Sequence, residues 1–241
     1  MNKNSLNKKI LPIIILHGWG LSTLVYKNIV KILKKRNHRV YVFDFPGFGE
    51  EPLGNNRVLS DYVIFLKNYL EKRKIKKCIL IGHSFGGRIA LKFSIKYPIN
   101  VDKIILTGVP VIRHNGMKQI IAGIIAFFGK KIICIFPKFL EILFRKLLYR
   151  LIGESDYIRA GKLKDLFTNI ITEDISGYFR DSIVPIYLIW GESDSITPVS
   201  DISIMKKIRP NIKYIIIPNT GHRLPYENSF IFANELENYI L

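Results

Sequence analysis

A serine lies between small residues where an apolar run ends and a helical pattern begins. Ser84 is the centre of the Gly82-x-Ser84-x-Gly86 pattern within CILIGHSFGGRIAL. Small neighbours permit a sharp turn that holds the serine at unfavourable backbone angles and projects its hydroxyl from the edge of a sheet. A strand before this pattern and a helix after it are the context expected of a nucleophile elbow. A purely structural strand-to-helix turn is the alternative interpretation.

A serine hydroxyl is a weak nucleophile and needs a base, which in turn needs a partner to orient it. Asp194 follows the apolar run PIYLIWG, and His222 follows KYIIIP. In a parallel sheet the loops after the strands open at one edge, so these side chains can meet Ser84 despite their separation in sequence. Alone, Asp194 could cap a helix near Pro198, and His222 could be an ordinary loop histidine. Together the three residues predict a Ser-His-Asp triad.

Acyl transfer also needs donors for the negative oxygen of the tetrahedral intermediate. The backbone N–H of Phe85, just after the nucleophile, is one candidate. The N–H of Trp19 is the other, because the glycines that flank it in HGWG let the backbone approach a ligand. Those glycines could instead serve only the turn into the first helix. We also expect the Trp19 ring to form a wall of the acyl pocket.

The elements that must position these residues alternate between apolar runs and helical patterns. Strands are predicted at Ile10 to Leu16, Arg39 to Phe43, Cys78 to Ile81, Lys103 to Leu106, Ile186 to Trp190 and Lys213 to Ile217. Helices are predicted near Leu21 to Lys35, Leu59 to Lys74, Phe85 to Lys96, Val199 to Lys207 and Ser229 to Tyr239. Buried strands separated by helices predict a doubly wound α/β sheet of about six strands, mostly or entirely parallel.

The strand rhythm disappears in the middle of the chain. From about Val111 to Ser182 the sequence is apolar at helical spacing, is interrupted by Gly and Pro, and carries mostly basic charges. Ligands of open α/β sheets bind at the carboxyl edge. We therefore predict a helical lid over residues 111–182, inserted into a core made of residues 1–110 and 183–241.

Composition limits the classes of partner. The chain has 241 residues and a net charge of +18, yet no basic run interleaved with aromatic residues resembles a nucleic-acid module. The charge could reflect the abundance of lysine, or could attract an anionic carrier protein or membrane surface. Its two cysteines cannot form a disulfide framework, and its apolar runs are shorter than the roughly 20 residues that span a bilayer. A cytoplasmic protein that binds no nucleic acid is expected.

The stretches LHGWG, DFPGFGEEP, GHSFGG, WGESD and GHRLPYE together resemble the successive signatures of the α/β-hydrolase family. The resemblance covers nearly the whole chain outside the predicted lid. It implies Ser84 as nucleophile, His222 as base, Asp194 as its acid, and Trp19 and Phe85 as oxyanion donors, with no metal or cofactor. Relatives that open epoxides or remove halide carry aspartate at the elbow, so the serine argues against those reactions.

The chain departs from the family pattern at its start. Only about nine residues precede Ile10, too few for the usual initial hairpin, so an all-parallel sheet is expected. Asp44 is expected to organise the loop after it and His83 to shape the elbow, although either could contact substrate. Arg113 and His114 at the start of the lid could meet a polar substrate group, or could be solvated.

The function predicted is hydrolysis of carboxylic esters, or thioesters, through an acyl-enzyme on Ser84, with an apolar acyl group. LHGWGL and DFPGFG are also similar to a methyl esterase acting on an acyl-carrier-protein-linked ester. Hydrolysis of a carbon–carbon bond by the same triad is a further alternative. A non-catalytic protein that docks on membrane through the basic insertion is an alternative from another class.

Overall fold

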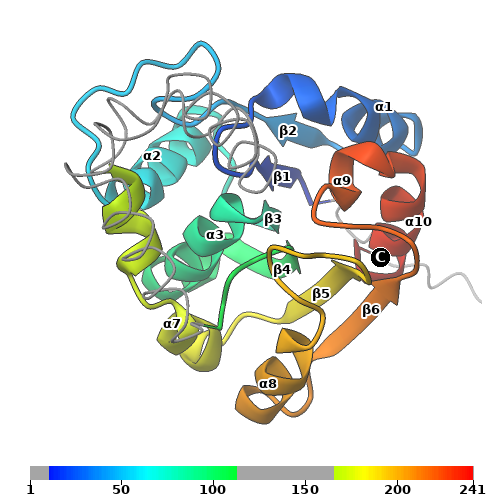
Figure 1. Ribbon diagram of the computed structural model, residues 1–241. Coiled ribbons are helices and arrows are strands. Elements are labelled where there is room, and N and C mark those ends of the chain that lie inside the picture. The colour runs from blue at the N-terminus through cyan, green and yellow to red at the C-terminus, as the bar shows by residue number, and fades with distance from the viewer. Residues whose placement is uncertain (1–10, 113–165, 241) are drawn as a thin grey trace, which may run out of the picture.

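A single parallel sheet forms the centre of the molecule. The computed structural model describes residues 11–112 and 166–240, and within these ranges six strands lie in the order β2-β1-β3-β4-β5-β6, every neighbouring pair parallel (Figure 1). The strands are β1 Ile13–Leu16, β2 Val40–Val42, β3 Cys78–His83, β4 Val101–Thr107, β5 Ile186–Gly191 and β6 Lys213–Ile217. The predicted doubly wound, parallel α/β fold is confirmed.

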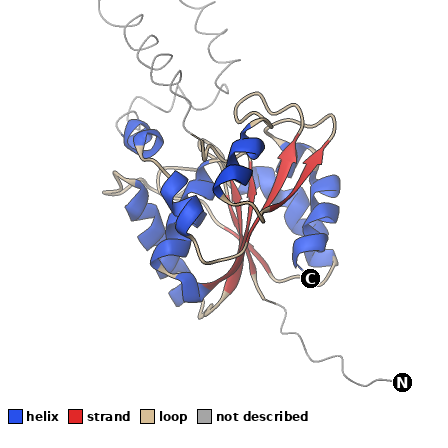
Figure 2. Ribbon diagram, turned by 90° about the horizontal axis from the view of Figure 1, so that it is seen from below, coloured by secondary structure: helices blue, strands red, loops and turns tan. Residues whose placement is uncertain are grey.

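Helices cover both faces of this sheet (Figure 2). They are η1 Thr23–Tyr26, α1 Lys27–Lys35, α2 Leu59–Lys72, α3 Phe85–Lys96, η2 Pro98–Asn100, α7 Ser176–Asp181, α8 Asp201–Ile208, α9 Leu224–Glu227 and α10 Ser229–Ile240. The helices α1, α9 and α10 pack on one face, while α2, α3, α7 and α8 pack on the other. Parallel strands need such crossover helices, which bury both faces.

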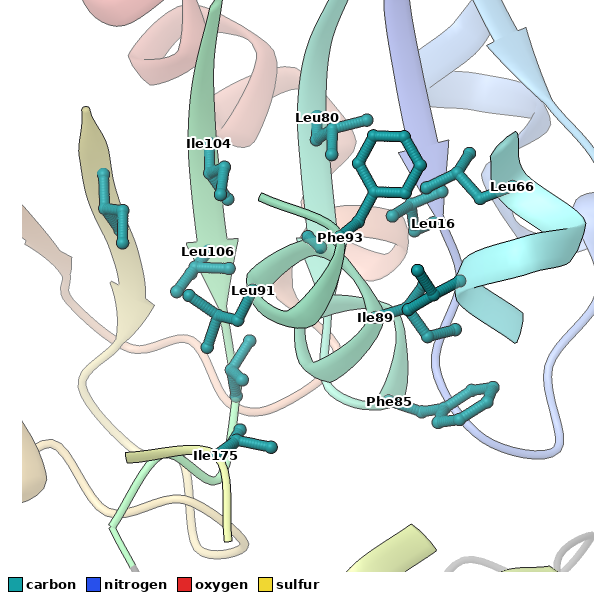
Figure 3. Close-up of a cluster of buried hydrophobic side chains, with 14 of the residues drawn as sticks. Leu16, Leu66, Leu80, Phe85, Ile89, Leu91, Phe93, Ile104, Leu106 and Ile175 are labelled. Atoms are coloured by element: carbon teal, nitrogen blue, oxygen red, sulfur yellow. The ribbon is translucent and has the colours of Figure 1, made fainter. Parts of the chain in front are cut away.

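Strand side chains alternate between two hydrophobic layers, as the two-residue repeat of a strand requires. In β1, Ile14 and Leu16 join the layer under α2 and α3, whereas Ile13 and Ile15 join the layer under α1 and α10. Around α3 the first layer includes Leu80, Ile104 and Leu106 of the sheet and reaches Ile175 (Figure 3). The continuous apolar runs in the sequence are thus explained by burial on both faces.

One predicted helix is divided. The pattern from Leu21 to Lys35 predicts a single helix, but the structure forms the 3-10 turn η1 and then α1. The tighter turn closes with an i+3 hydrogen bond from Val25 N–H to the Ser22 carbonyl at 3.4 Å. Tyr26, at the end of this turn, is completely buried beneath the site described below.

Most of the predicted lid, including Arg113 and His114, lies outside the described residues. The part that is described, residues 166–181, packs against α3 and contributes Ile170, Ile175 and Phe179 to the core on that side. The division of the chain into core and lid therefore stays a prediction. None of the helices in the described ranges has the length and apolar character needed to cross a bilayer.

Candidate active site

Ser84 occupies a strained turn between β3 and α3. Its backbone angles are φ 49° and ψ −112°, which residues other than glycine rarely adopt. The surrounding structure holds this conformation, because the Ser84 N–H donates to the Thr107 carbonyl at 3.0 Å and the Gly87 N–H donates to the Ser84 carbonyl at 3.0 Å. The turn lies at the carboxyl end of β3, where the sequence predicts it.

The glycines around Ser84 are required by the close packing of this turn. A Cβ atom at position 82 would lie 2.5 Å from the Cα atom of Gly87. At Gly86 a Cβ atom would lie 2.1 Å from the Leu16 carbonyl oxygen. Both separations are shorter than any contact between non-bonded carbon or oxygen atoms allows. The Gly82-x-Ser84-x-Gly86 pattern therefore brings α3 against β1 and against the end of its own strand.

Asp194 and His222 are brought together from loops after β5 and β6. The His222 Nδ1 atom lies 2.9 Å from Asp194 Oδ2 and donates to it. The other carboxylate oxygen, Asp194 Oδ1, accepts the N–H groups of Ile196 at 2.9 Å and Thr197 at 2.8 Å, while the Thr197 hydroxyl donates to Oδ2 at 2.7 Å. Burial by itself raises the pKa of Asp194, but the bonds from His222 and Thr197 and the charge of His222 lower it overall.

Gly108 makes room for this pair, although no motif in the sequence marks it. It follows β4 at φ +59°, and a Cβ atom there would lie 2.8 Å from His222 Cε1 and 3.3 Å from Asp194 Oδ2. Its only sequence signal is a glycine directly after a predicted strand. That position is common in turns of every kind, so the signal does not point to catalysis.

Ser84 and His222 lie at the same edge of the sheet. The backbone carbonyl of His222 is 3.0 Å from Nε2 of His83, the residue before the serine. Among the described residues no hydrogen bond joins the Ser84 hydroxyl to the His222 ring. Catalytic hydrogen bonds are often long before substrate binds.

The two predicted oxyanion donors belong to neighbouring segments. Within the described ranges, neither the Trp19 N–H nor the Phe85 N–H donates a hydrogen bond to another residue. The Trp19 ring packs at centroid distances of 4.9 Å from Phe48, 5.4 Å from Phe85 and 5.0 Å from Phe167. This aromatic cluster is apolar and includes the residue directly after Ser84.

Side chains near the site hold its loops. Asp44 Oδ1 accepts the Thr23 N–H at 2.6 Å, and its Oδ2 accepts the Glu50 N–H at 3.5 Å, so it organises the loops as expected. His17 is buried, donates from Nδ1 to the Gly18 carbonyl at 2.7 Å and accepts the Phe45 N–H on Nε2 at 2.9 Å. Burial lowers the pKa of His17 to about 4, against smaller raising effects of the Gly18 bond and the Asp44 charge.

Metal-ligating side chains and the Cys78 thiol are two further kinds of group that could carry chemistry in the described part of the chain. No group of three or more His, Cys, Asp or Glu side chains in residues 11–112 and 166–240 is suited to hold a metal ion. Cys78 is buried, and this burial raises the pKa of its thiol to about 12. A thiol of such high pKa is a poor nucleophile.

Comparison with known proteins identifies the family of this chain. The model of the alpha/beta hydrolase family matches residues 13–234. The chain belongs to this family. As a hydrolase-family member it shares its fold with an alpha/beta hydrolase enzyme from a Medee basin deep-sea metagenome library, with a TM-score of 0.73 at 22% identity over 98% of this chain and 90% of the other.

Curated relatives match this hydrolase-family chain over nearly its whole length and nearly the whole of their own. A pimeloyl-[acyl-carrier protein] methyl ester esterase of Wigglesworthia glossinidia brevipalpis is 29% identical, over 95% of this chain and 93% of its own. The enzyme of the same name from Legionella pneumophila (strain Paris) is 25% identical, over 95% of each chain.

Proposed function

We propose that this protein hydrolyses carboxylic esters through an acyl-enzyme on Ser84. The Ser84 oxygen attacks the ester carbonyl while His222 Nε2 takes its proton, and the N–H groups of Trp19 and Phe85 stabilise the resulting oxyanion. Collapse of the intermediate breaks the bond to the alkoxy group, which leaves as an alcohol with the proton from His222. Water, activated by the same imidazole, then releases the acid and restores Ser84.

The His222–Asp194 contact carries this proposal. An ionised carboxylate that accepts from Nδ1 leaves the proton-free Nε2 to act as base. The carboxylate is 2.9 Å from the imidazole and is held by Thr197, so the ring has a defined orientation. The strained Ser84 turn at the same edge supplies the partner for that base.

A Ser84→Ala variant tests the role of the serine. Losing the nucleophile is expected to lower kcat on short p-nitrophenyl esters by about 10⁴-fold or more. A fluorophosphonate probe should label the wild-type protein and not the variant. Ser203→Ala on α8, which removes a hydroxyl exposed to solvent, is the matched control and should keep both activity and labelling. Substantial activity in Ser84→Ala would exclude the mechanism.

For the substrate we propose a methyl ester of an acyl chain carried by an acyl carrier protein. The curated relatives that match this chain over most of its length act on such an ester by name. The aromatic cluster around Trp19 suits an apolar chain, and the net charge of +18 suits an acidic carrier. We place this activity in the cytoplasm as part of the same proposal.

Comparing two substrates tests the carrier. We expect kcat/KM to be higher for the carrier-linked methyl ester than for the methyl ester of the same acid without a carrier. We also expect that advantage to shrink between about 0.05 and 0.5 M salt, because screening weakens charge steering. Equal values for the two substrates would remove the carrier from the proposal and leave ester hydrolysis standing.

A further inference from the structure

A chain of hydrogen bonds runs beneath the site from the oxyanion loop to the loop of the base. The Gly18 N–H donates to Tyr26 Oη at 3.3 Å. Tyr26 Oη lies 2.8 Å from His83 Nδ1, and His83 Nε2 lies 3.0 Å from the His222 carbonyl oxygen. Tyr26 is completely buried and His83 is 1% exposed, so water does not compete for these bonds.

The donor and acceptor of each of these three hydrogen bonds follow from the two backbone groups at the ends, the His222 carbonyl and the Gly18 N–H. The His222 carbonyl can only accept, so the proton of the His83 ring is on Nε2. In a neutral imidazole Nδ1 is then an acceptor, and it takes the hydroxyl proton of Tyr26. The Tyr26 oxygen in turn accepts the Gly18 N–H. All four groups are satisfied in one arrangement, and reversing any bond leaves a buried donor or acceptor unpaired.

The strand order shows which parts of the site these hydrogen bonds connect. The loop after β6 carries His222, and β6 is separated from β3 by β4 and β5. No strand ladder therefore connects the base directly to the strand that carries the nucleophile. His83, the residue before Ser84, makes that connection through its ring. Tyr26 extends it to the loop that carries the Trp19 N–H.

We propose that Tyr26 and His83 are positioning residues that hold the loops of the base and of the oxyanion donor in register with the nucleophile. The proposal rests on the ester hydrolysis described above. Neither side chain touches substrate. They act by fixing the backbone of His222 and of Gly18, and an error of about 1 Å in such a placement can cost about 100-fold in rate.

Two other features of the structure support this role. A Cβ atom at Gly18 would lie 3.0 Å from His83 Nδ1, so glycine permits the loop to approach the ring closely. Burial, with a smaller contribution from the His222 charge, lowers the pKa of His83 to about 3, so the ring keeps the neutral form that the chain of bonds requires. Burial also raises the pKa of Tyr26, which keeps its hydroxyl proton in place.

Removing one hydroxyl tests the proposal. Tyr26→Phe keeps the ring and breaks two bonds, and we expect kcat on p-nitrophenyl butyrate to fall by about 10-fold or more with KM changed less than twofold. Tyr62→Phe is the matched control, since Tyr62 is equally buried and its hydroxyl donates to the Pro46 carbonyl at 3.0 Å. The control breaks one buried bond instead of two, so it should lose some stability and keep kcat. Equal kcat values for the two variants would overturn the role.

A pair of substitutions at His83 separates positioning from packing. His83→Gln retains an N–H near the place of Nε2, whereas His83→Leu fills similar space without a donor. We expect the glutamine variant to keep at least about ten times the kcat of the leucine variant when both melt at similar temperatures. A leucine variant as active as the glutamine variant would contradict the proposal.

Hydrogen exchange gives a readout that does not depend on catalysis. Tyr26→Phe should raise amide exchange in both the 17–21 and the 220–223 segments, whereas Tyr62→Phe should leave them unchanged. Unchanged exchange would overturn the coupling whatever the activity shows. An inactive wild-type protein, or an active Ser84→Ala variant, would instead refute the proposed function.

Discussion

At the scale of single residues, Asp194 both caps a turn and contacts His222, two roles between which the sequence does not decide. Its Oδ1 atom holds the turn at Ile196 and Thr197, as a helix-capping residue would, while its Oδ2 atom faces His222. The turn thereby fixes the carboxylate before it meets the imidazole. Because the carboxylate is already held in place, the site does not have to reorganise during the reaction.

Replacing this carboxylate with an amide tests its role. Asp194→Asn is nearly isosteric, but it has one oxygen where the carboxylate uses two: Oδ1 for the Ile196 and Thr197 N–H groups and Oδ2 for His222 Nδ1. With the amide oxygen kept by the two N–H groups, its NH2 group faces Nδ1, and the imidazole is no longer held in the tautomer that leaves Nε2 free. We expect kcat to fall by about 10⁴-fold, the loss typical of such triads. Steady-state kinetics on p-nitrophenyl butyrate measures it.

Thr197→Val is the control for this change, because it removes only the hydroxyl that donates to Asp194 Oδ2 and keeps the carboxylate. A loss below about 100-fold is expected for it, since one donor of several is removed. An Asp194→Asn variant within tenfold of the wild-type kcat would show that the carboxylate is not the acid of the triad.

At the scale of elements, α3 connects the nucleophile to the segment that returns from the predicted lid. Arg88, one turn beyond the elbow, donates from Nη2 to the Ile170 carbonyl at 2.6 Å and also to the Glu173 carbonyl. These carbonyls lie at the end of a helix that reaches residue 172, where intrahelical partners are lacking. One turn further on, Lys92 pairs with the Glu173 carboxylate at 2.6 Å. The elbow helix thus anchors the returning segment.

Arg88→Met tests this anchor. Methionine keeps the apolar part of the side chain but removes the Arg88 donor from the carbonyl of Ile170, which is a buried residue. We therefore expect the free energy of unfolding to fall by about 1–3 kcal/mol. Amide exchange and proteolysis should rise most in residues 166–181.

Lys92→Met is the matched control on the same helix. It removes a partly exposed ion pair and should cost no more than about 1 kcal/mol. Equal stability losses for the two variants, without local opening in Arg88→Met, would argue against the anchor.

At the scale of the whole molecule, acid acts on the fold through histidines that are buried as neutral rings. His17 and His83 have pKa values lowered from 6.5 to about 4 and about 3. In the unfolded chain both take up protons below about pH 6.5, whereas in the folded chain they do so only near those lower values. Their contribution to stability is therefore complete above pH 6.5 and is lost as the pH falls toward 4.

Urea unfolding across a pH series checks this sign. We expect the free energy of unfolding to fall between pH 6.5 and 4.5, with each of the two histidines contributing about 1.4 kcal/mol per pH unit. His83→Gln removes one of these groups and should have a flatter profile than the wild type. A profile of unchanged slope in this variant would show that His83 is protonated in the folded protein.

The sequence alone determined the order and type of the main elements, because burial on both faces leaves long runs of Ile, Val and Leu, as in Ile13–Leu16. It also indicated the positions of Ser84, Asp194 and His222, since each follows a strand and loops after parallel strands share one edge. The roles of these three residues stay predictions for the kinetics above to test.

Only the tertiary structure decided how the site is held together. Gly108 beside His222 and the Tyr26–His83 bonds join residues from four separate segments. Such contacts have no repeat along the chain, because they depend on the register of the sheet and on which loops meet above it. Periodicity reports whether a residue faces the core, and so it reveals elements, whereas hydrogen bonds between loops arise only once those elements are packed.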